Sequence, residues 1–403
     1  MSDFIKQRTI QAAEQGVARA KALIDMGEHD QAAAVCNQVL ARDHQAPGPS
    51  ILGMQIAAAC GDFDTAIKQA EQALRTRPRF EDGEFSCGLD LTYADVADQI
   101  DDICRMFNAL LAQQVGESVE TFAVPGLIRF RQGLADHVRG RLGEAREHYL
   151  AVLTDPVGAH YLIGPVLNLL AALEQQRGTP ENAFRWIDRE TYPLELQPLG
   201  DVGGTEVESF NDGLFEEVMA SPKLTYWEES QSEQWFIAPE LNDETAGPYV
   251  KQLEQVFLRN AEENLAAFRD TSPVPDHATF GQAPDDYDVE MFSAVLKGPG
   301  HVGPHVHSDA FLVGNYYVRV PEEPADAPDG AGCIEYGKHV YHAATGTDYQ
   351  RRRFNPKAGT MLMWPSYFSH GTIPSTAPGV RMVVGFDLVP KGATGTYGKI
   401  ERG

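Results

Sequence analysis

Three histidines and an aspartate occupy odd-numbered positions in one short stretch of the chain. His301, His305, His307 and Asp309 lie in GHVGPHVHSDAFLVGNYYVRVP, which continues into strand-forming residues. In a β-strand, residues two apart point to the same face, so these side chains can share one side of a sheet. Imidazole and carboxylate groups bind divalent transition metals. The spacing therefore predicts a group of metal ligands at the edge of a sheet.

A second group of candidate residues lies further along, in KAGTMLMWPSYFSHGTIPSTAPGVRMVVGFDLVP. There His370 follows an apolar strand, and Arg381 lies on the next strand among Val380, Met382 and Val383. A guanidinium group is planar and permanently charged, and it binds carboxylates in a two-pronged geometry. The sequence therefore predicts a third metal ligand and, near it, an apolar pocket for a carboxylate.

The order of these residues resembles the double-stranded β-helix of the 2-oxoglutarate- and Fe(II)-dependent oxygenases. The resemblance covers Ser209 to Pro390 and is greatest to a bacterial branch with the pattern PHxH…H…R, often found behind tetratricopeptide repeats. The matching segments are PHVH (Pro304–His307), LVGNYYVRVP (Leu312–Pro321), AGTMLMWPSYFSHGTIP (Ala358–Pro374) and RMVVGFDLVP (Arg381–Pro390). The chain departs from that branch at Val313 and Asn315, where we expect a local effect.

This resemblance implies Fe(II) as cofactor, with 2-oxoglutarate and O2 as co-substrates. It implies that oxidative decarboxylation of 2-oxoglutarate to succinate and CO2 is coupled to hydroxylation of a C–H bond. Arg381 would hold the distal carboxylate of 2-oxoglutarate, and a tyrosine of NYYV would add a hydroxyl donor. Tyr317 is the first choice and Tyr316 the alternative, because sequence alone does not settle which of the two faces the site.

The metal ligands have two interpretations. In the first, His305, His307 and His370 form an all-histidine triad, which the resemblance favours because it places PHVH at the ligand position. In the second, His307 and Asp309 form the usual His-x-Asp pair of Fe(II) oxygenases, with His370 as the third ligand. His307 and His370 are ligands in both. For His301 two roles are open: a polar loop residue, or a residue beside the site that hydrogen-bonds a ligand.

Three further residues near these motifs have competing interpretations. Trp364 fits core packing and substrate contact equally well. Glu335 and Asp387 are candidates for substrate contact, but we expect both on solvated strand faces. A purely structural role for Arg381 would pair its charge with one of these two carboxylates.

The N-terminal half contains a repeated pattern. GEHDQAAAVCNQVLARD begins at Gly27 and GDFDTAIKQAEQALRTRP at Gly61, a period of 61 − 27 = 34 residues, with further copies at Gly140 and Gly178. In each copy, glycine permits a tight turn and an alanine five residues later lets two helices approach closely. The pattern resembles the tetratricopeptide repeat, which implies a concave surface for a peptide or protein partner. A bracing or dimerising role is equally open.

These motifs predict an α+β multidomain chain. We place an all-α, tetratricopeptide-like helical repeat domain at residues 1–195 and a double-stranded β-helix (jelly-roll, cupin-like) domain at residues 196–403. The boundary follows Pro193, where the chain becomes rich in glycine and polar residues. One more helix is expected between Gly247 and Asp270, and short strands with Gly/Pro punctuation follow it.

Composition excludes some partners. The net charge of −25 disfavours nucleic acid, and no apolar run predicts a membrane segment or a secretory signal. Five scattered cysteines predict reduced thiols, so we expect a cytoplasmic protein. Homo-oligomerisation is left open. Besides the 2-oxoglutarate-dependent hydroxylase, acting on a peptide, a protein or a small molecule, two alternatives remain. They are a three-histidine iron dioxygenase that needs no 2-oxoglutarate and a scaffold with an inert barrel.

Overall fold

The protein is described here by a computed structural model. It describes residues 126–154, 160–183, 186–187, 193–199, 207–226, 234–237, 241–268 and 284–391, with short gaps inside the last range, and shorter pieces between residues 15 and 86. The chain forms two compact units, described separately below. One contains Met1–Ala159 with Ala343–Gly346, and the other contains His160–His342 with Thr347–Gly403.

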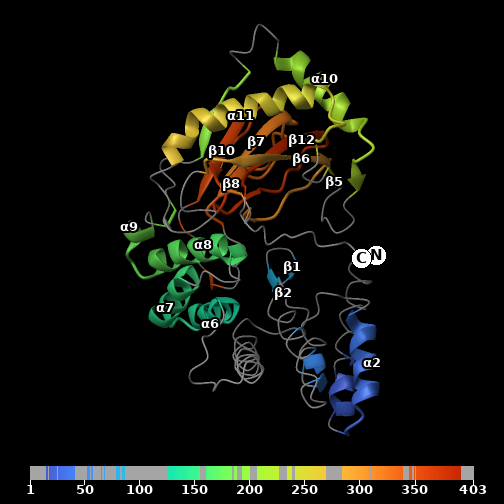
Figure 1. The fold of residues 1–403 in the computed structure, drawn as a ribbon, viewed down its shortest axis with the longest axis vertical. Coiled ribbons are helices and arrows are strands. Elements are labelled where there is room, and N and C mark those ends of the chain that lie inside the picture. The colour runs from blue at the N-terminus through green and yellow to red at the C-terminus, as the bar shows by residue number, and fades with distance from the viewer. Residues whose placement is uncertain are drawn as a thin grey trace. The chain divides into compact units, whose positions relative to one another are not determined.

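The second unit is built on two antiparallel sheets (Figure 1). The larger sheet has the order β3-β10-β7-β12-β6-β5-β4, and the smaller has the order β11-β8-β9. The strands of the larger sheet are β3 (Leu194–Leu196), β4 (Thr225–Tyr226), β5 (Gln234–Ile237), β6 (Tyr287–Lys297), β7 (Leu312–Arg319), β10 (Met361–Pro365) and β12 (Val380–Pro390). Those of the smaller are β8 (Ile334–Tyr336), β9 (Arg352–Phe354) and β11 (His370–Thr372). This arrangement confirms the predicted jelly-roll-like core.

The central strands explain the long apolar runs in the sequence. β12 lies between β6 and β7, and it pairs with β6 from Val380↔Lys297 to Pro390↔Tyr287. A strand covered on both faces reads as a nearly continuous apolar run, as VRMVVGFDLVP does. The register of β12 with β7 shifts between Met382 and Val383. A bulge of this kind re-aims nearby side chains, and its extra residue is Val318 on β7, next to Tyr317.

Two helices cover one face of the larger sheet, α10 (Val207–Met219) and α11 (Pro248–Phe268) (Figure 1). α11 is the helix expected between Gly247 and Asp270, and its buried residues follow the spacing of one helical face. They are Val250, Leu253, Val256, Phe257, Ala261 and Leu265. Proline at the first helical position suits its start, and the Glu217 carboxylate of α10 accepts hydrogen bonds from the next two backbone N–H groups, at 3.0 Å each.

Helices α8 (His160–Gln176) and α9 (Pro180–Ala183) also belong to the second unit. In the sequence they fall within the predicted repeat domain. The predicted boundary at residue 195 stays a prediction, because a helix can continue a repeat by sequence and still pack with a neighbouring domain.

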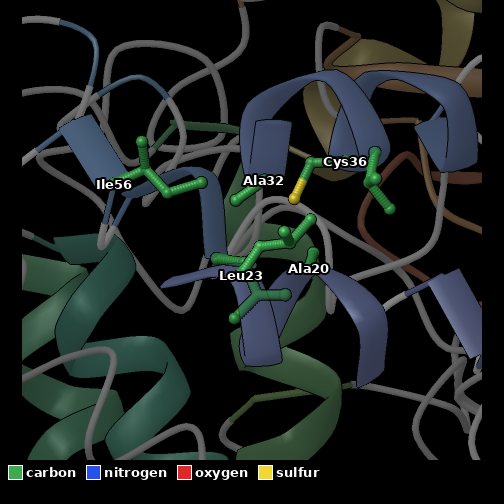
Figure 2. Close-up of a cluster of buried hydrophobic side chains, with 7 residues drawn as sticks. Ala20, Leu23, Ala32, Cys36 and Ile56 are labelled. Carbon is green, nitrogen blue, oxygen red and sulfur yellow. The ribbon is translucent and has the colours of Figure 1, made fainter. Parts of the chain in front are cut away.

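The first unit is helical where the structure describes it, apart from a small hairpin of β1 (Arg79–Glu81) and β2 (Glu84–Ser86). Its helices include α2 (His29–Leu40), α6 (Gly126–Val138) and α7 (Leu142–Thr154). Figure 2 shows a cluster of buried side chains in this unit, among them Ala32 and Cys36 on α2. Cys36 is buried in this cluster, and burial raises the pKa of its thiol.

The repeat pattern has a local counterpart at three of its four copies. Gly27, Gly140 and Gly178 have φ values of 78°, 74° and 77°, in the left-handed region that glycine adopts without strain. The alanines five residues later, Ala32, Ala145 and Ala183, are buried. The copy at Gly61 lies outside the described residues at its turn. Tight helical turns of this kind occur in many helical folds, so the tetratricopeptide array stays a prediction. Within the described part of the chain, no helix combines the length and apolarity needed to cross a membrane.

Candidate metal centre

Backbone hydrogen bonds bring the two ligand-bearing segments together. His305 N–H donates to His370 O at 2.9 Å, and His370 N–H donates to His305 O at 3.0 Å. A further backbone bond runs from His307 N–H to Ser366 O at 3.0 Å. Residues that exchange both hydrogen bonds stand directly opposite each other. The segment before β7 and the loop between β10 and β11 are thus held in a fixed register.

This register gathers three histidine side chains. One ring nitrogen from each of His305, His307 and His370 can be chosen so that all three lie within 4.8 Å of one another. The ring centroids are 4.3 Å apart for His305 and His370, 5.1 Å for His305 and His307, and 5.3 Å for His307 and His370. Three imidazoles this close together form the predicted all-histidine group.

Each imidazole has an acceptor at Nδ1. The partner is Gly303 O at 2.9 Å for His305, Phe368 O at 3.0 Å for His370, and an Asp387 carboxylate oxygen at 3.0 Å for His307. Carbonyl and carboxylate oxygens only accept, so Nδ1 carries the hydrogen in each ring. In a neutral ring the lone pair is then on Nε2, the arrangement found in ligating histidines that are oriented by a hydrogen bond.

The protonation state of His370 agrees with this role. Burial lowers the pKa of His370 well below its usual range, and the neighbouring His305 and His307 lower it further. A neutral imidazole is the form that binds a metal. His301 lies beside the group, half-buried, with its pKa lowered by burial and then by Lys338. The described residues contain no contact that makes His301 a ligand.

The structure corrects the expectation for Asp387. We expected this carboxylate on a solvated strand face, but its two oxygens lie 2.9 and 3.0 Å from Nδ1 of His307. This contact fixes the orientation of the His307 ring. Residues of equal parity share one face of a strand, so a site that contains Arg381 also faces Asp387 on β12. The odd numbering that Asp387 shares with Arg381 was the signal in the sequence that Asp387 faces the site.

The alternative ligand Asp309 lies outside the described residues. The interpretation in which His307 and Asp309 are both metal ligands therefore stays a prediction. The described residues supply the histidine group only.

Arg381 points from the larger sheet towards the smaller one. Its side chain is buried, and it donates a hydrogen bond to Gly332 O, just before β8. The guanidinium carbon lies 5.4 Å from the centre of the Tyr317 ring. Among the described residues, no carboxylate forms an ion pair with Arg381: Asp387 binds His307, and Glu335 binds two other arginines. A buried charge without a counter-charge is costly, so this arrangement fits an anionic ligand.

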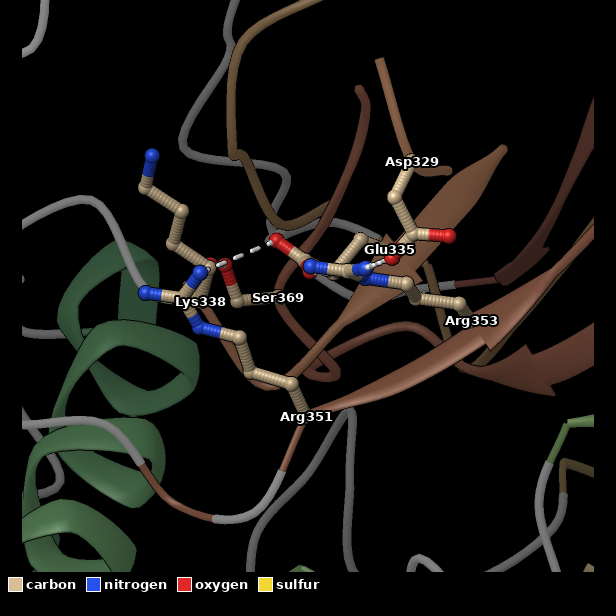
Figure 3. A network of polar contacts seen from close by, with 6 residues as sticks. All are labelled: Asp329, Glu335, Lys338, Arg351, Arg353 and Ser369. Atoms are coloured by element: carbon tan, nitrogen blue, oxygen red, sulfur yellow. Dashed lines mark hydrogen bonds and ion pairs between the residues drawn. The ribbon is translucent and has the colours of Figure 1, made fainter. Parts of the chain in front are cut away.

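Figure 3 shows the contacts of Glu335, which the structure also places differently from our expectation. Glu335 is buried, not solvated, and its carboxylate lies 2.9 Å from Arg353 Nε and 3.6 Å from Arg351. Glu335 stands opposite Gly371 in the pairing of β8 with β11, next to His370. Its ion pairs therefore brace the strand that carries a metal ligand.

The two candidate tyrosines of NYYV point to opposite sides. Tyr316 donates a hydrogen bond to Asn211 Oδ1 at 2.6 Å and packs edge-on against Phe210, both on α10. Tyr317 faces Arg381, and burial raises its pKa, so its hydroxyl stays protonated and can donate. Of the two alternatives, only Tyr317 faces the site.

Two more polar groups line the same interior, and the sequence did not single them out for this role. The Tyr336 hydroxyl and the Trp364 indole N–H are buried, and neither has a hydrogen-bond partner among the described residues. Both rings lie against His370, at centroid distances of 6.0 Å for Tyr336 and 4.7 Å for Trp364. Buried donors are normally paired. Unpaired donors beside three histidines and a buried arginine fit a metal with an oxygen-rich anion.

A sequence comparison identifies part of this unit. Residues 290–387 match the family described as "Putative 2OG-Fe(II) oxygenase". The matched range contains all three histidines, Arg381 and Asp387. The family match supports a 2-oxoglutarate- and Fe(II)-dependent oxygenase that uses Fe(II), 2-oxoglutarate and O2. A search among curated proteins found no match.

A comparison with solved structures gives matches at low identity. A prolyl-4-hydroxylase from Pseudomonas putida is 14% identical, with a TM-score of 0.33, and the match covers 51% of this chain and 96% of that one. A prolyl hydroxylase from Trichoplax adhaerens is 11% identical over 53% and 91% of the two chains, with a TM-score of 0.34. HygX from Streptomyces hygroscopicus, with nickel and 2-oxoglutarate bound, is 14% identical over 50% and 83%, with a TM-score of 0.31. Likeness at this level carries no argument about substrate.

Proposed function

We propose that the protein is an Fe(II)- and 2-oxoglutarate-dependent dioxygenase that hydroxylates a C–H bond, with His305, His307 and His370 as metal ligands. The observation that carries this proposal is the pairing of two features inside one barrel. Three imidazoles have Nδ1–H groups oriented by oxygen acceptors, and one ring nitrogen from each lies within 4.8 Å of the others. Nearby, a buried arginine has no carboxylate partner among the described residues.

When bound, the iron would supply O2 activation, and 2-oxoglutarate would supply two of the four electrons that reduce O2, with release of succinate and CO2; the substrate C–H bond would supply the other two. The chain's own residues hold and orient these groups. His305 and His370 stand opposite each other across a hydrogen-bonded register, so their separation is set by the backbone. The hydrogen bond to Asp387 orients the His307 ring. A ligand that is already oriented loses less conformational freedom when the metal binds.

Arg381 would hold the far carboxylate of 2-oxoglutarate. A guanidinium binds a carboxylate through two parallel hydrogen bonds, which a lysine ammonium cannot do. The Tyr317 hydroxyl, protonated because burial raises its pKa, would donate a further hydrogen bond. The unpaired Tyr336 hydroxyl is available to the same anion. The apolar walls around these groups exclude water, which strengthens each of these interactions.

For the primary substrate we propose a chemical class and not a specific compound. A peptide or protein substrate agrees with partner-binding repeats in the same chain, with the repeats as docking platform. A small molecule would fit the barrel as well. Assembly of several copies is compatible with both.

The test is binding of 2-oxoglutarate to the metal-loaded protein, measured by calorimetry without O2. We expect Arg381→Ala to weaken binding by about 100-fold, because loss of a charge-assisted pair costs about 3 kcal/mol. Arg319→Ala is the matched control, since Arg319 lies on β7 and its guanidinium contacts α10, 2.9 Å from Asp212 and over the ring of Phe215. Equal binding by wild type and Arg381→Ala would favour the dioxygenase that needs no 2-oxoglutarate. No metal binding at all would favour the scaffold.

A further inference from the structure

Helix α8 carries a buried asparagine whose side chain leaves the helix to contact the metal-ligand loop. Asn168 is fully buried, and its neighbours from Val166 to Leu173 are apolar and buried as well. A lone amide in such a setting is costly unless every hydrogen bond is made. The contacts of Asn168 therefore indicate what the residue does.

All four hydrogen-bonding positions of the amide are used. Nδ2 donates to Gly164 O within the helix and to Tyr367 O, at 2.7 Å each. Oδ1 accepts from Ser369 N–H at 3.1 Å and from the Tyr349 hydroxyl. The orientation of the amide follows from these partners, because the two carbonyls only accept and Ser369 N–H only donates. Asn168 thus hydrogen-bonds to the backbone of Ser369, directly before His370, and of Tyr367, three residues before His370.

One turn earlier, the same helix meets the other ligand segment. A Cβ atom built on Gly164 would lie 3.2 Å from the side chain of Val306 and 3.6 Å from Tyr367 Cα. Val306 stands between the ligands His305 and His307. The absence of a side chain at Gly164 therefore lets α8 lie close to both ligand segments at once.

From these contacts we propose that Gly164 and Asn168 of α8 form a bracket that positions the metal ligands. Asn168 positions His370 through the backbone of Tyr367 and Ser369, and Gly164 leaves the room that His305 and His307 require. Neither residue touches the metal, so both are positioning residues. The inference rests on the proposed function, because it concerns the same three histidines. It makes a helix from the predicted repeat region a working part of the oxygenase site.

The bracket predicts a change in metal binding that a loss of stability alone does not produce. Asn168→Ala removes the bonds to Tyr367 and Ser369, so the His370 loop is no longer pinned to α8. Partners that orient ligands typically change metal affinity by about 10- to 100-fold. Because Asn168 acts through the loop backbone, we expect the lower end, about tenfold. Gly164→Ala should move Val306 by a few tenths of an ångström and have a smaller effect.

The experiment is a titration of the full-length apo-protein with Co(II), read by the visible spectrum of the bound ion and by the Kd. Asn260→Ala is the matched control for Asn168→Ala. Asn260 is a buried helical asparagine on α11 with the same bond to the carbonyl four residues earlier, at 2.8 Å, but it has no described contact with a ligand segment. Gly143→Ala is the control for Gly164→Ala, because a Cβ at Gly143 meets no atom within 4 Å.

We expect Asn168→Ala to raise the Kd for Co(II) about tenfold and to alter the spectrum of the bound ion, with Asn260→Ala unchanged in both. Tyr349→Phe removes one bond to Asn168 and keeps the rest, so it gives a milder test if the alanine variant does not fold. Wild-type spectrum and affinity in the folded Asn168 and Tyr349 variants would overturn the bracket alone. Failure of the wild type to bind Co(II) would overturn the proposed function together with it.

Discussion

Replacing Asp387 with alanine removes the acceptor that orients His307. In the structure, the two carboxylate oxygens lie 2.9 and 3.0 Å from His307 Nδ1. A hydrogen bond with a charged partner contributes about 1.5–3 kcal/mol, and each 1.4 kcal/mol is a factor of ten in Kd. Because the Asp387 side chain is 19% exposed, water screens part of this contribution. We therefore expect Asp387→Ala to raise the Kd for Fe(II) about tenfold, at the lower end of this range.

The assay is an anaerobic Fe(II) competition titration, with far-ultraviolet circular dichroism as the check on folding. Asp387→Asn keeps a neutral acceptor and should lose only about threefold in affinity, since neutral hydrogen bonds are about half as strong. Asp288→Ala is the matched control, because Asp288 lies on the neighbouring strand β6 and its side chain is 68% exposed. An Asp387→Ala protein that is folded and binds Fe(II) like the wild type would refute the orienting role.

Three further predictions follow from the described contacts. Tyr317→Phe should weaken 2-oxoglutarate binding about fivefold through loss of one hydrogen bond, whereas Tyr316→Phe, which loses its bond to Asn211, should leave it unchanged; calorimetry compares the two. Glu335→Ala should lower the free energy of unfolding by roughly 2 kcal/mol, since two arginines lose a buried anion; urea unfolding measures this, with Glu322→Ala as an exposed control. Lys223 holds the pKa of Asp243 at about 2, because its cation favours the ionised carboxylate. Lys223→Met should therefore raise that pKa towards 3.8, and NMR titration of the carboxyl measures the change.

The proximity of the three histidines was predictable because its signal in the sequence is local. His305 and His307 stand two residues apart before a strand, and His370 and Arg381 belong to a pattern of similar order. The side of β7 that faces the site was not predictable, because Tyr316 and Tyr317 are adjacent residues of one type. Burial of the Tyr316 hydroxyl against α10 decides this, and a helix position is a property of the tertiary fold.

The residues that contact the histidine segments from elsewhere in the fold could not be predicted from local sequence patterns. Asn168 and Tyr367 are 199 residues apart in the chain, and no spacing rule connects them. From the sequence, Glu335 is expected to be a solvated strand residue. Its partners Arg351 and Arg353 lie on another segment, and nothing next to Glu335 in the sequence indicates that they pair with it. Asp387 was within reach, because it shares strand parity with Arg381. A buried polar residue is placed by its partners, which only the fold brings together.

The most direct test of the central claim is the visible absorption of the anaerobic protein during addition of Fe(II) and then 2-oxoglutarate. A keto acid bound to Fe(II) produces a metal-to-ligand charge-transfer band. The account predicts this band in the wild type, its absence in His370→Ala, and a much weaker band in Arg381→Ala at the same 2-oxoglutarate concentration. Iron binding by the wild type without any such band would contradict the account.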